Sequence, residues 1–260
     1  MMDINKQRES IEIPFFSIVT ICWNAVEDLK RTSESVEKQI YRNFEWIVID
    51  GGSEDETLDF IKDCKEVSQW ISEPDKGIFD AWNKGIKLSK GEYVLILNAG
   101  DTYTEDALIT YSENVFNNVI TCASARVVCQ DKISDKAVTV FRSKPHLLYK
   151  GMYVPHNWCA VPLGIYEEFG LYRHLEYSMD YDWFARYFKV KGNSGFNVID
   201  NVLGVYSLGG LSDINYKESF LANERIIKEL GVHPLMARYY RLTSTFRHYL
   251  SNILVSLNMR

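Results

Sequence analysis

Aspartates at the ends of apolar segments are the residues of this chain best placed to do chemistry. The segment VLILNAGD, residues 94–101, is apolar through Leu97 and ends in a lone carboxylate at Asp101. A strand this apolar is typical of a parallel sheet covered on both faces, in which ligands bind at the carboxyl ends of the strands. Asp101 is therefore predicted to lie at a ligand-binding site.

Three further acids follow two other apolar segments. Asp50 ends FEWIVID, and Asp75 and Asp80 flank Gly77 just after WISE. A carboxylate in such a place accepts hydrogen bonds from a ribose or a base, whereas one that faces a diphosphate needs a divalent cation between the two negative groups. A single acid of this kind is more often a cap for the next helix or turn. The recurrence at successive strand ends instead favours one shared crevice.

Alternating strand and helix patterns in the first half of the chain would position these acids. The predicted strands are 15–22, 44–50, 70–73 and 91–101. The predicted helices are 26–40, whose apolar stripe runs from Val26 to Ile40, 53–64, which a Ser53 and Glu56 capping box opens, and 77–89. Strands separated by helices indicate an α/β fold with a parallel sheet and right-handed crossovers.

Composition narrows the class of protein. The chain has 260 residues, 46% of them hydrophobic, which is enough for one large α/β domain or for a domain with an appendage. A net charge of −6 and the lack of a Lys/Arg block before residue 230 argue against a nucleic-acid partner. The five cysteines lack Cys-x-x-Cys spacing, which predicts core thiols in a reducing compartment. The N-terminal segment is charged and no apolar run approaches the roughly 18 residues that span a bilayer, so we expect a cytoplasmic protein.

Four segments of the first half resemble, in order and spacing, the nucleotide-sugar-binding half of family-2 glycosyltransferases with the GT-A fold: FFSIVTICWN, FEWIVIDGGSEDET, SEPDKGIFDAWNKGI and KGEYVLILNAGD. The resemblance covers about residues 15–110 and is strongest to bacterial members that build O-antigen, capsule or colanic-acid-like polysaccharides. It implies a Rossmann-like, mostly parallel central sheet flanked by helices. We expect a single GT-A domain over residues 1–232, with the acceptor half at about 111–232.

The resemblance also implies roles for individual residues. The donor site would contain Thr20, Asn24, Asp50, Asp75, Asp80 and Asn83, and Asp101 would bind Mn²⁺ or Mg²⁺. Many relatives share the metal among several acids at this strand end, whereas residues 98–101 here are NAGD. One Asp, two diphosphate oxygens and waters are a reasonable Mg²⁺ shell, so metal affinity without donor should be weak. Trp82 replaces an Arg that lies near the diphosphate in other branches. The negative charge of the diphosphate would then be neutralised by Lys84, by a later basic residue, or by no residue of the protein.

The segment LEYSMDYDWFARYF, residues 175–188, resembles the acceptor-side motif of the family. By that resemblance Asp180 matches the catalytic base, with Asp182 and Arg186 behind it, and Met179 replaces an acidic neighbour. On the residues alone, Asp180 and Asp182 are explained equally well as first-turn acids that complement a helix dipole.

Two other elements of the second half have open roles. His156, in VPHNW, occupies the place of an element that faces the sugars in relatives, but a lone His is as often a structural residue. SLGGLSD, residues 207–213, resembles a loop that closes over the substrates, and its two glycines are equally typical of an ordinary turn.

The reaction implied is inverting transfer of a sugar from a nucleoside-diphosphate sugar, UDP-linked, to a hydroxyl of a glycan acceptor. A metal would stabilise the leaving diphosphate and a base would deprotonate the acceptor, the roles that suit Asp101 and Asp180. Two other classes stay open. A nucleotidyltransferase acting on sugar phosphates would have a Gly-rich basic loop, which TICWNAVED is not. A non-catalytic nucleotide-sugar-binding module would have no need of Asp180.

The tail, residues 233–260, lies outside the resemblance and predicts a basic amphipathic helix. No acid follows Glu229. The apolar residues recur at spacings of four and three, and they are Leu235, Tyr239, Leu242, Phe246, Tyr249, Ile253 and Leu257. This composition suits a peripheral contact with the inner face of the cytoplasmic membrane, where polysaccharide-building relatives act on polyprenyl-linked acceptors. It suits equally well a stripe that packs on the protein's own domain or on a second subunit.

Overall fold

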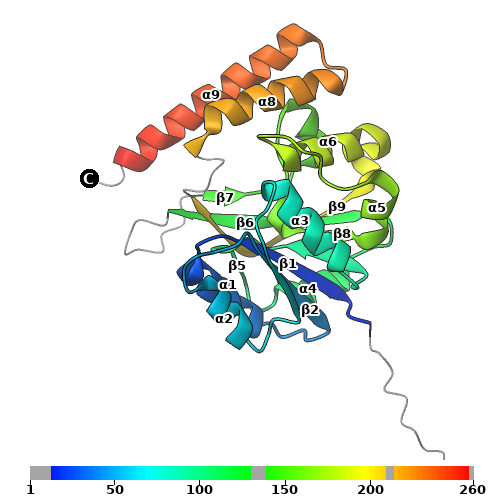
Figure 1. Cartoon of the computed structure of the whole chain (residues 1–260). Helices are drawn as coiled ribbons and strands as arrows, with labels where there is room; N and C mark the ends of the chain where they lie inside the picture. The colour runs from blue at the N-terminus through cyan, green and yellow to red at the C-terminus, as the bar shows by residue number, and fades with distance from the viewer. Residues whose placement is uncertain (1–12, 130–138, 209–213, 258–260) are drawn as a thin grey trace, which may run out of the picture.

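A helix-covered β-sheet forms the centre of the molecule, with a helical hairpin at one end (Figure 1). The computed structural model describes residues 13–129, 139–208 and 214–257. The strand order is β3-β2-β1-β4-β8-β6-β9-β5, and β7 pairs with β6. The chain segment 207–213, singled out above as a closing loop, lies largely outside the described residues.

The first four strands run parallel, as predicted, and carry the acids at their carboxyl ends. They are β1 Phe16–Cys22, β2 Phe44–Asp50, β3 Gln69–Ser72 and β4 Tyr93–Ile96. The α/β fold with a sheet flanked by helices is confirmed. The remaining strands are β5 Thr102–Tyr103, β6 Ile120–Cys129, β7 Thr139–Phe141, β8 Cys159–Pro162 and β9 Phe196–Leu208. β8 is inserted antiparallel between β4 and β6, while β6 and β9 are parallel.

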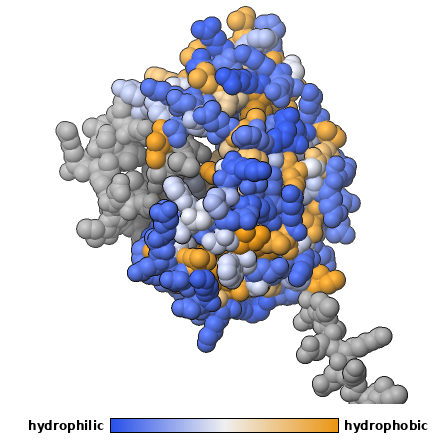
Figure 2. All heavy atoms as spheres, viewed as in Figure 1, coloured by the Kyte–Doolittle hydropathy of each residue, from blue (hydrophilic) through white to orange (hydrophobic). Residues whose placement is uncertain are grey.

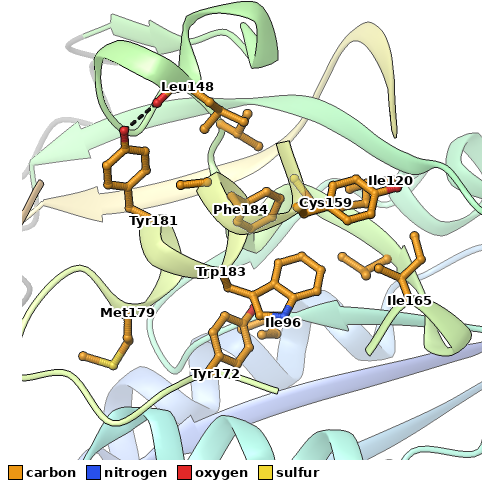
Figure 3. Close-up of a cluster of buried hydrophobic side chains, with 14 of the residues drawn as sticks. Ile96, Ile120, Leu148, Cys159, Ile165, Tyr172, Met179, Tyr181, Trp183 and Phe184 are labelled. Carbon is orange, nitrogen blue, oxygen red and sulfur yellow. Dashed lines mark hydrogen bonds between the residues drawn. The ribbon is translucent and has the colours of Figure 1, made fainter. Parts of the chain in front are cut away.

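Helices bury both faces of the sheet. One core contains residues of α1 Val26–Glu37, α2 Thr57–Asp63 and α4 Ala107–Asn114. The other contains residues of α3 Ile78–Leu88, α5 Leu163–Phe169, α6 Met179–Lys191 and α8 Tyr216–Glu229. Along β4, Val94 faces the second core and Leu95 the first, which is why this strand is apolar without alternation. Figure 3 shows Trp183 and Phe184 of α6 within the second core.

Three details of the first half differ from the sequence prediction. Helix α1 ends at Glu37, so Ile40 falls beyond the apolar stripe and is 65% exposed. The capping box was wrong, because α2 begins only at Thr57 and Ser53 instead donates its hydroxyl to Asp50. The strand predicted for 91–101 ends at Ile96, and Asp101 follows a turn that leads into β5.

The long aromatic segment of the second half contains more regular structure than the sequence indicated. Besides β7, β8 and α5 it holds the short 3₁₀ helices η1 Pro145–Lys150 and η2 His156–Trp158. A further 3₁₀ turn, η3 Gly192–Gly195, follows α6.

Three cysteines are buried, as expected of core thiols, whereas Cys64 is only half-buried. Cys22, Cys122 and Cys159 are each less than 9% exposed. Cys122 and Cys159 are Cα partners on β6 and β8, and their Sγ atoms lie 3.3 Å apart. The side chain of Cys129 lies outside the described residues.

The C-terminal helix, α9 Pro234–Leu257, packs on α8 as a hairpin. Ala237 is fully buried in this contact, and Arg241 Nε lies 2.6 Å from Glu224 Oε2. The predicted apolar stripe faces away. Its described members are 50–71% exposed, and they are Leu235, Tyr239, Leu242, Phe246 and Tyr249. These five residues therefore keep at least half of their surface exposed and are not part of the buried core.

The described residues include no helix with both the length and the apolar composition needed to cross a membrane.

Replacing Gly85 with alanine should destabilise the fold. Gly85 faces the sheet from α3, and an added Cβ would stand 2.2 Å from Val19 Cγ1. Overpacking of a core costs about 1–3 kcal/mol, so the urea midpoint should fall. The matched control is Gly164→Ala in α5, where an added Cβ meets nothing within 4 Å, and its midpoint should be unchanged or higher. A Gly85→Ala protein as stable as wild type would contradict the tight α3–β1 contact.

Candidate active site

The start of α6 is held in place by a buried ion-pair cluster. Asp182 is 1% exposed and accepts hydrogen bonds from both Arg173 and Arg186. Arg186 also donates to the backbone carbonyls of Phe169 and Leu171. The carboxylate of Asp182 is thus fully engaged with protein. The resemblance places Asp182 on the acceptor side. In the structure its ion pairs hold the turn of α6 that also contains Asp180.

Asp180, in the first turn of α6, keeps its carboxylate accessible. Its side chain is 27% exposed, and Oδ2 lies 3.6 Å from Nδ1 of His156. Burial lowers the pKa of His156, and the opposing attraction of Asp180 does not cancel this effect. A neutral imidazole therefore stands beside the carboxylate at neutral pH. The structure thus places the predicted base, Asp180, next to His156, one of the two residues predicted for the acceptor side.

A continuous series of contacts joins this pair to Asp101. The ring of His156 packs edge-on against Trp82, with centroids 4.9 Å apart. Trp82 Nε1 donates to Asn98 Oδ1 at 3.0 Å. Asn98 Nδ2 lies 3.5 Å from Asn157 Oδ1, and Asn157 Nδ2 donates to Asp101 Oδ2. Side-chain contacts that pass through Trp82 therefore link the two carboxylates that the resemblance assigns to metal and base.

Side-chain amides surround the carboxylate of Asp101. Its side chain is only 5% exposed, and Asn157 Nδ2 donates to its Oδ2, while Asn157 Oδ1 accepts from Asn98 Nδ2. Carboxylate and amide oxygens are the ligands that hard divalent cations take. No group of three or more His, Cys, Asp or Glu suited to a metal occurs among the described residues. The set fits a cation only if substrate oxygens or waters complete its shell.

Two of the predicted donor residues lie beneath the surface. Thr20 and Asp50 are both 0% exposed. Thr20 Oγ1 accepts from Trp46 Nε1 at 2.9 Å, and Asp50 accepts from Ser53 and from Ser72. Their side chains hold β1, β2 and β3 in register at the ends where the acids gather.

Asn24 and Asp75 lie nearer the surface at the same edge. Asn24 adopts φ = 48°, a left-handed conformation that Asn tolerates better than most residues. Its backbone N–H donates to Ser53 Oγ, and its Oδ1 accepts from the N–H of Glu54. Asp75 approaches the same loop, because a Cβ on Gly51 would lie 3.1 Å from Asp75 Oδ2.

Lys84 is committed to acids and does not replace the missing arginine. Its Nζ lies 2.6 Å from Asp75, 2.9 Å from Glu73 and 3.5 Å from Asp80. Burial lowers the pKa of Lys84, but the hydrogen bonds and charges of these acids outweigh it and raise the pKa above its usual value. The backbone N–H of Lys76 and the charge of Lys84 lower the pKa of Asp80. Asp80 is therefore ionised at neutral pH.

Asn83 connects the two halves of the site. Its Nδ2 donates to the carbonyl of Tyr172, and its Oδ1 accepts from the N–H of the same residue. Both ends of the amide are therefore used by the backbone beside Arg173. Asn83 thus fastens the backbone at Tyr172 to α3, and its predicted place at the donor site stays a prediction.

Two residues of the site were missed from the sequence. Trp23 is 67% exposed and lies beside Gly51 at the strand-end edge. The sequence shows a Trp directly before Asn24, and the structure adds that this Trp is exposed. Asn157 gave no such signal, because its partner Asp101 lies 56 residues away along the chain.

Comparison with known families identifies a sequence match that covers this site in part. Residues 17–153, which are 137 of the 260, match the family model described as Glycosyl transferase family 2. Asp180 and Asp182 lie beyond the matched range.

Curated relatives align with the chain over a shorter range. An uncharacterized glycosyltransferase of Mycobacterium tuberculosis is 40% identical over 93 residues, which is 35% of this chain. A PGL/p-HBAD biosynthesis glycosyltransferase of Mycobacterium bovis is 36% identical over 100 residues, which is 36% of this chain. The matches span only 36% and 39% of the lengths of these two relatives.

Solved structures with the same fold are glycosyltransferases. S. aureus TarS 1–349 in complex with UDP-GlcNAc superposes with a TM-score of 0.62 at 14% identity, over 90% of this chain and 72% of its own. A mannosyltransferase from Pyrobaculum calidifontis in complex with GDP-Man and Mn²⁺ gives a TM-score of 0.58 at 14% identity, over 95% and 79%. At this identity the likeness shows the fold alone, and it confirms the predicted GT-A architecture.

The pH dependence of stability tests the buried position of His156. Because its pKa is lowered on folding, the unfolded chain takes up this proton first on acidification. The contribution of neutral His156 to the free energy of unfolding is complete above about pH 6.5. It declines as the pH falls toward the lower folded-state pKa. Urea unfolding between about pH 7 and pH 5 should show a smaller loss of stability for His156→Gln than for wild type.

The control for this measurement is His146→Gln, since His146 is exposed. This variant should lose stability on acidification as wild type does. Identical pH profiles for wild type and His156→Gln would contradict the burial of a neutral imidazole next to Asp180.

Proposed function

The chain belongs to glycosyl transferase family 2, and we propose that it transfers a sugar from a UDP-sugar to a hydroxyl of a glycan acceptor, with inversion at the anomeric carbon. The observation that carries the proposal is the unbroken series of contacts between Asp101 and Asp180. It supports one site with a carboxylate for the leaving diphosphate and a second, accessible carboxylate for the acceptor.

The donor binds, on this proposal, over the strand ends that carry Asn24, Asp75 and Trp23. The exposed indole of Trp23 offers a flat face for a base. Asp50 and Thr20 act from below by holding the loop and the strands. The nucleotide sugars named with the TarS and Pyrobaculum structures support this class of donor.

Asp101 is the residue proposed to hold Mn²⁺ or Mg²⁺ together with diphosphate oxygens. A bound cation would stabilise the negative charge that develops on the leaving diphosphate. Lys84 is neutralised by three acids, and Trp82 carries no charge. Neither of these two described residues thus offers the diphosphate an uncompensated positive charge, which favours metal dependence.

Asp180 is proposed as the general base. It accepts the proton of the acceptor hydroxyl as that oxygen attacks the anomeric carbon, and the bond to the diphosphate breaks in the same displacement. His156 lies beside the carboxylate as a neutral ring and keeps it oriented without pairing its charge. The two arginines on Asp182 fix the turn from which Asp180 projects.

The acceptor is proposed to be a lipid-linked glycan, with a polyprenyl diphosphate carrier, used in cell-surface polysaccharide synthesis such as that of O-antigen. The protein would then act in the cytoplasm at the inner face of the membrane. The outward stripe of α9 supports this placement, since five of its apolar or aromatic side chains are at least half exposed. The name of the mycobacterial PGL/p-HBAD relative is consistent with it.

Asp101→Asn should abolish the effect of metal on nucleotide binding. The amide keeps the shape of the side chain and a hydrogen-bonding oxygen for Asn157, but it removes the charge that attracts a divalent cation. Calorimetric titration with UDP, with and without Mn²⁺, should show metal enhancement in wild type and none in the variant. The control Asp106→Asn alters an exposed carboxylate nearby and should behave as wild type. An unchanged metal effect in Asp101→Asn would rule out Asp101 as the ligand.

Asp180→Asn should separate binding from chemistry. Loss of a general base typically lowers the rate roughly 10²–10⁴-fold, while donor affinity should barely change. UDP release from UDP-GlcNAc and other UDP-sugars, with water as a slow acceptor, gives an assay that needs no glycan. Glu176→Gln, which removes an exposed acid in the preceding loop, is the matched control. Near-wild-type release by Asp180→Asn would assign the base to another residue, and no release by wild type would favour a binding module.

A further inference from the structure

A basic and aromatic groove lies between α9 and the η1 region, away from Asp101. It consists of two adjoining hollows of about 230 and 570 Å³. Lys150, Tyr153 and Arg247 line both of them. The larger hollow also contains Lys144, and its wall includes Tyr239 and Phe246 of the exposed stripe. The groove therefore continues directly into the apolar face of α9.

Three cations of this groove have no carboxylate partner among the described residues. No ion pair of Lys144, Lys150 or Arg247 with an acid occurs within the described part of the chain. Lys150 Nζ instead stands 5.1 Å from the ring of Tyr149 and 5.6 Å from that of Tyr240. Arg247 Nη1 donates to the hydroxyl of Tyr153 at 3.2 Å. The described residues that line the two hollows include no Asp or Glu, so the groove is positively charged.

The smaller hollow adds an acceptor that the protein leaves unused. Asn223 lines it, and the buried Oδ1 of Asn223 has no hydrogen-bond partner among the described residues. A buried acceptor without a donor is unfavourable, so a hydroxyl entering this hollow would be stabilised there. The groove thus offers cations for an anion and an acceptor for a hydroxyl group near it.

An exposed apolar helix face can bind either a second copy of the chain or a membrane. The charge of the surrounding surface distinguishes these two partners. A second copy of the chain would bring the same basic face against itself, since residues 230–260 contain no acid. An anionic bilayer presents the complementary charge and also apolar chains for the stripe. Figure 2 shows hydrophobic and hydrophilic side chains mixed over the top of the molecule, where the hairpin lies. An interfacial contact requires such a mixture.

The groove is coupled to the acceptor side of the proposed active site. Tyr181, the residue after Asp180, donates its hydroxyl to the carbonyl of Leu148 in η1 (Figure 3). Lys150 lies at the end of the same short helix. A lipid phosphate held by Lys150 would therefore be bound to an element that touches the first turn of α6.

We propose that Lys144, Lys150 and Arg247 form a binding site for the phosphate of an anionic phospholipid headgroup, with the stripe of α9 against the acyl chains. Asn223 receives a headgroup hydroxyl, such as those of phosphatidylglycerol. The site rests on the proposed function only in placing the protein at a membrane. Its physical basis, an unpaired basic groove beside an apolar face, does not depend on the sugar transferred.

Co-sedimentation of the full-length protein with vesicles tests the site. Wild type should bind vesicles of phosphatidylcholine and phosphatidylglycerol and should not bind pure phosphatidylcholine. Lys150→Glu/Arg247→Glu should weaken binding on the order of 30-fold or more, since each basic residue near an anionic surface contributes about fivefold. Lys150→Arg/Arg247→Lys keeps the charge and should keep the binding.

The matched control is Lys38→Glu/Lys65→Glu, which changes the net charge equally at two exposed residues elsewhere. This control should bind as wild type does. Equal weakening in both charge-reversed proteins would mean attraction by net charge alone and would overturn the site. Displacement by inorganic phosphate, beyond that by chloride at equal ionic strength, would indicate a free-phosphate site and would also overturn the headgroup proposal.

Two further measurements keep the proposal separate from its alternatives. Wild type could fail to bind vesicles and instead sediment as a dimer that Leu242→Glu/Phe246→Glu disrupts. This result would show that the apolar face of α9 binds a second copy of the chain. UDP binding should be unchanged in Lys150→Glu/Arg247→Glu. Vesicle binding without UDP binding in wild type would refute the proposed function but not this site, and the reverse result would refute this site alone.

Discussion

The buried carboxylate of Asp182 is the constraint on which the proposed active site depends. An isolated charge at 1% exposure would cost several kcal/mol, and Arg173 and Arg186 offset that cost by direct hydrogen bonds. Removing both arginines would leave the charge uncompensated, a change that typically costs about 3–5 kcal/mol. A shift of the first turn of α6 would separate the Asp182 carboxylate from its two arginine partners. Asp180, two residues earlier, takes its orientation from that rigidity.

The same cluster ties the acceptor side to the nucleotide-binding half. Tyr172, the neighbour of Arg173, exchanges two backbone hydrogen bonds with the amide of Asn83 in α3. Trp82, the neighbour of Asn83, contacts both His156 and Asn98. Adjacent residues of one helix thus link Asp180, Asp101 and the Asp182 cluster. A substitution at Asn83 would therefore disturb both halves of the proposed site, although the side chain is used entirely by the protein.

The sequence predicted what depends on local pattern and missed what depends on distant pairing. The four parallel strands and the acid at the end of β2 follow from apolar runs and from the residues that end them. Strand β8 was missed because four residues within an aromatic segment carry no periodic signal, and its place between β4 and β6 is set by tertiary packing. Asp180 was predicted by resemblance, but its partner His156 and the Asn157 bond to Asp101 join segments far apart in the chain. Ser53 matched a helix-capping pattern. In the structure, however, the hydroxyl of Ser53 donates to the buried carboxylate of Asp50 instead of capping a helix.

The paired thiols on β6 and β8 have a consequence for the chemical reactivity of the protein. Burial, together with the hydrogen bond to Cys122, raises the pKa of Cys159 well above its ordinary value. Electrophiles and peroxide attack the thiolate form, so Cys159 is inert while the sheet stays closed. Cys22 is protected in the same way, since burial and the charge of Asp50 raise its pKa. Alkylation of these sulfurs would therefore be limited by opening of the central sheet, and their modification would record how often that happens.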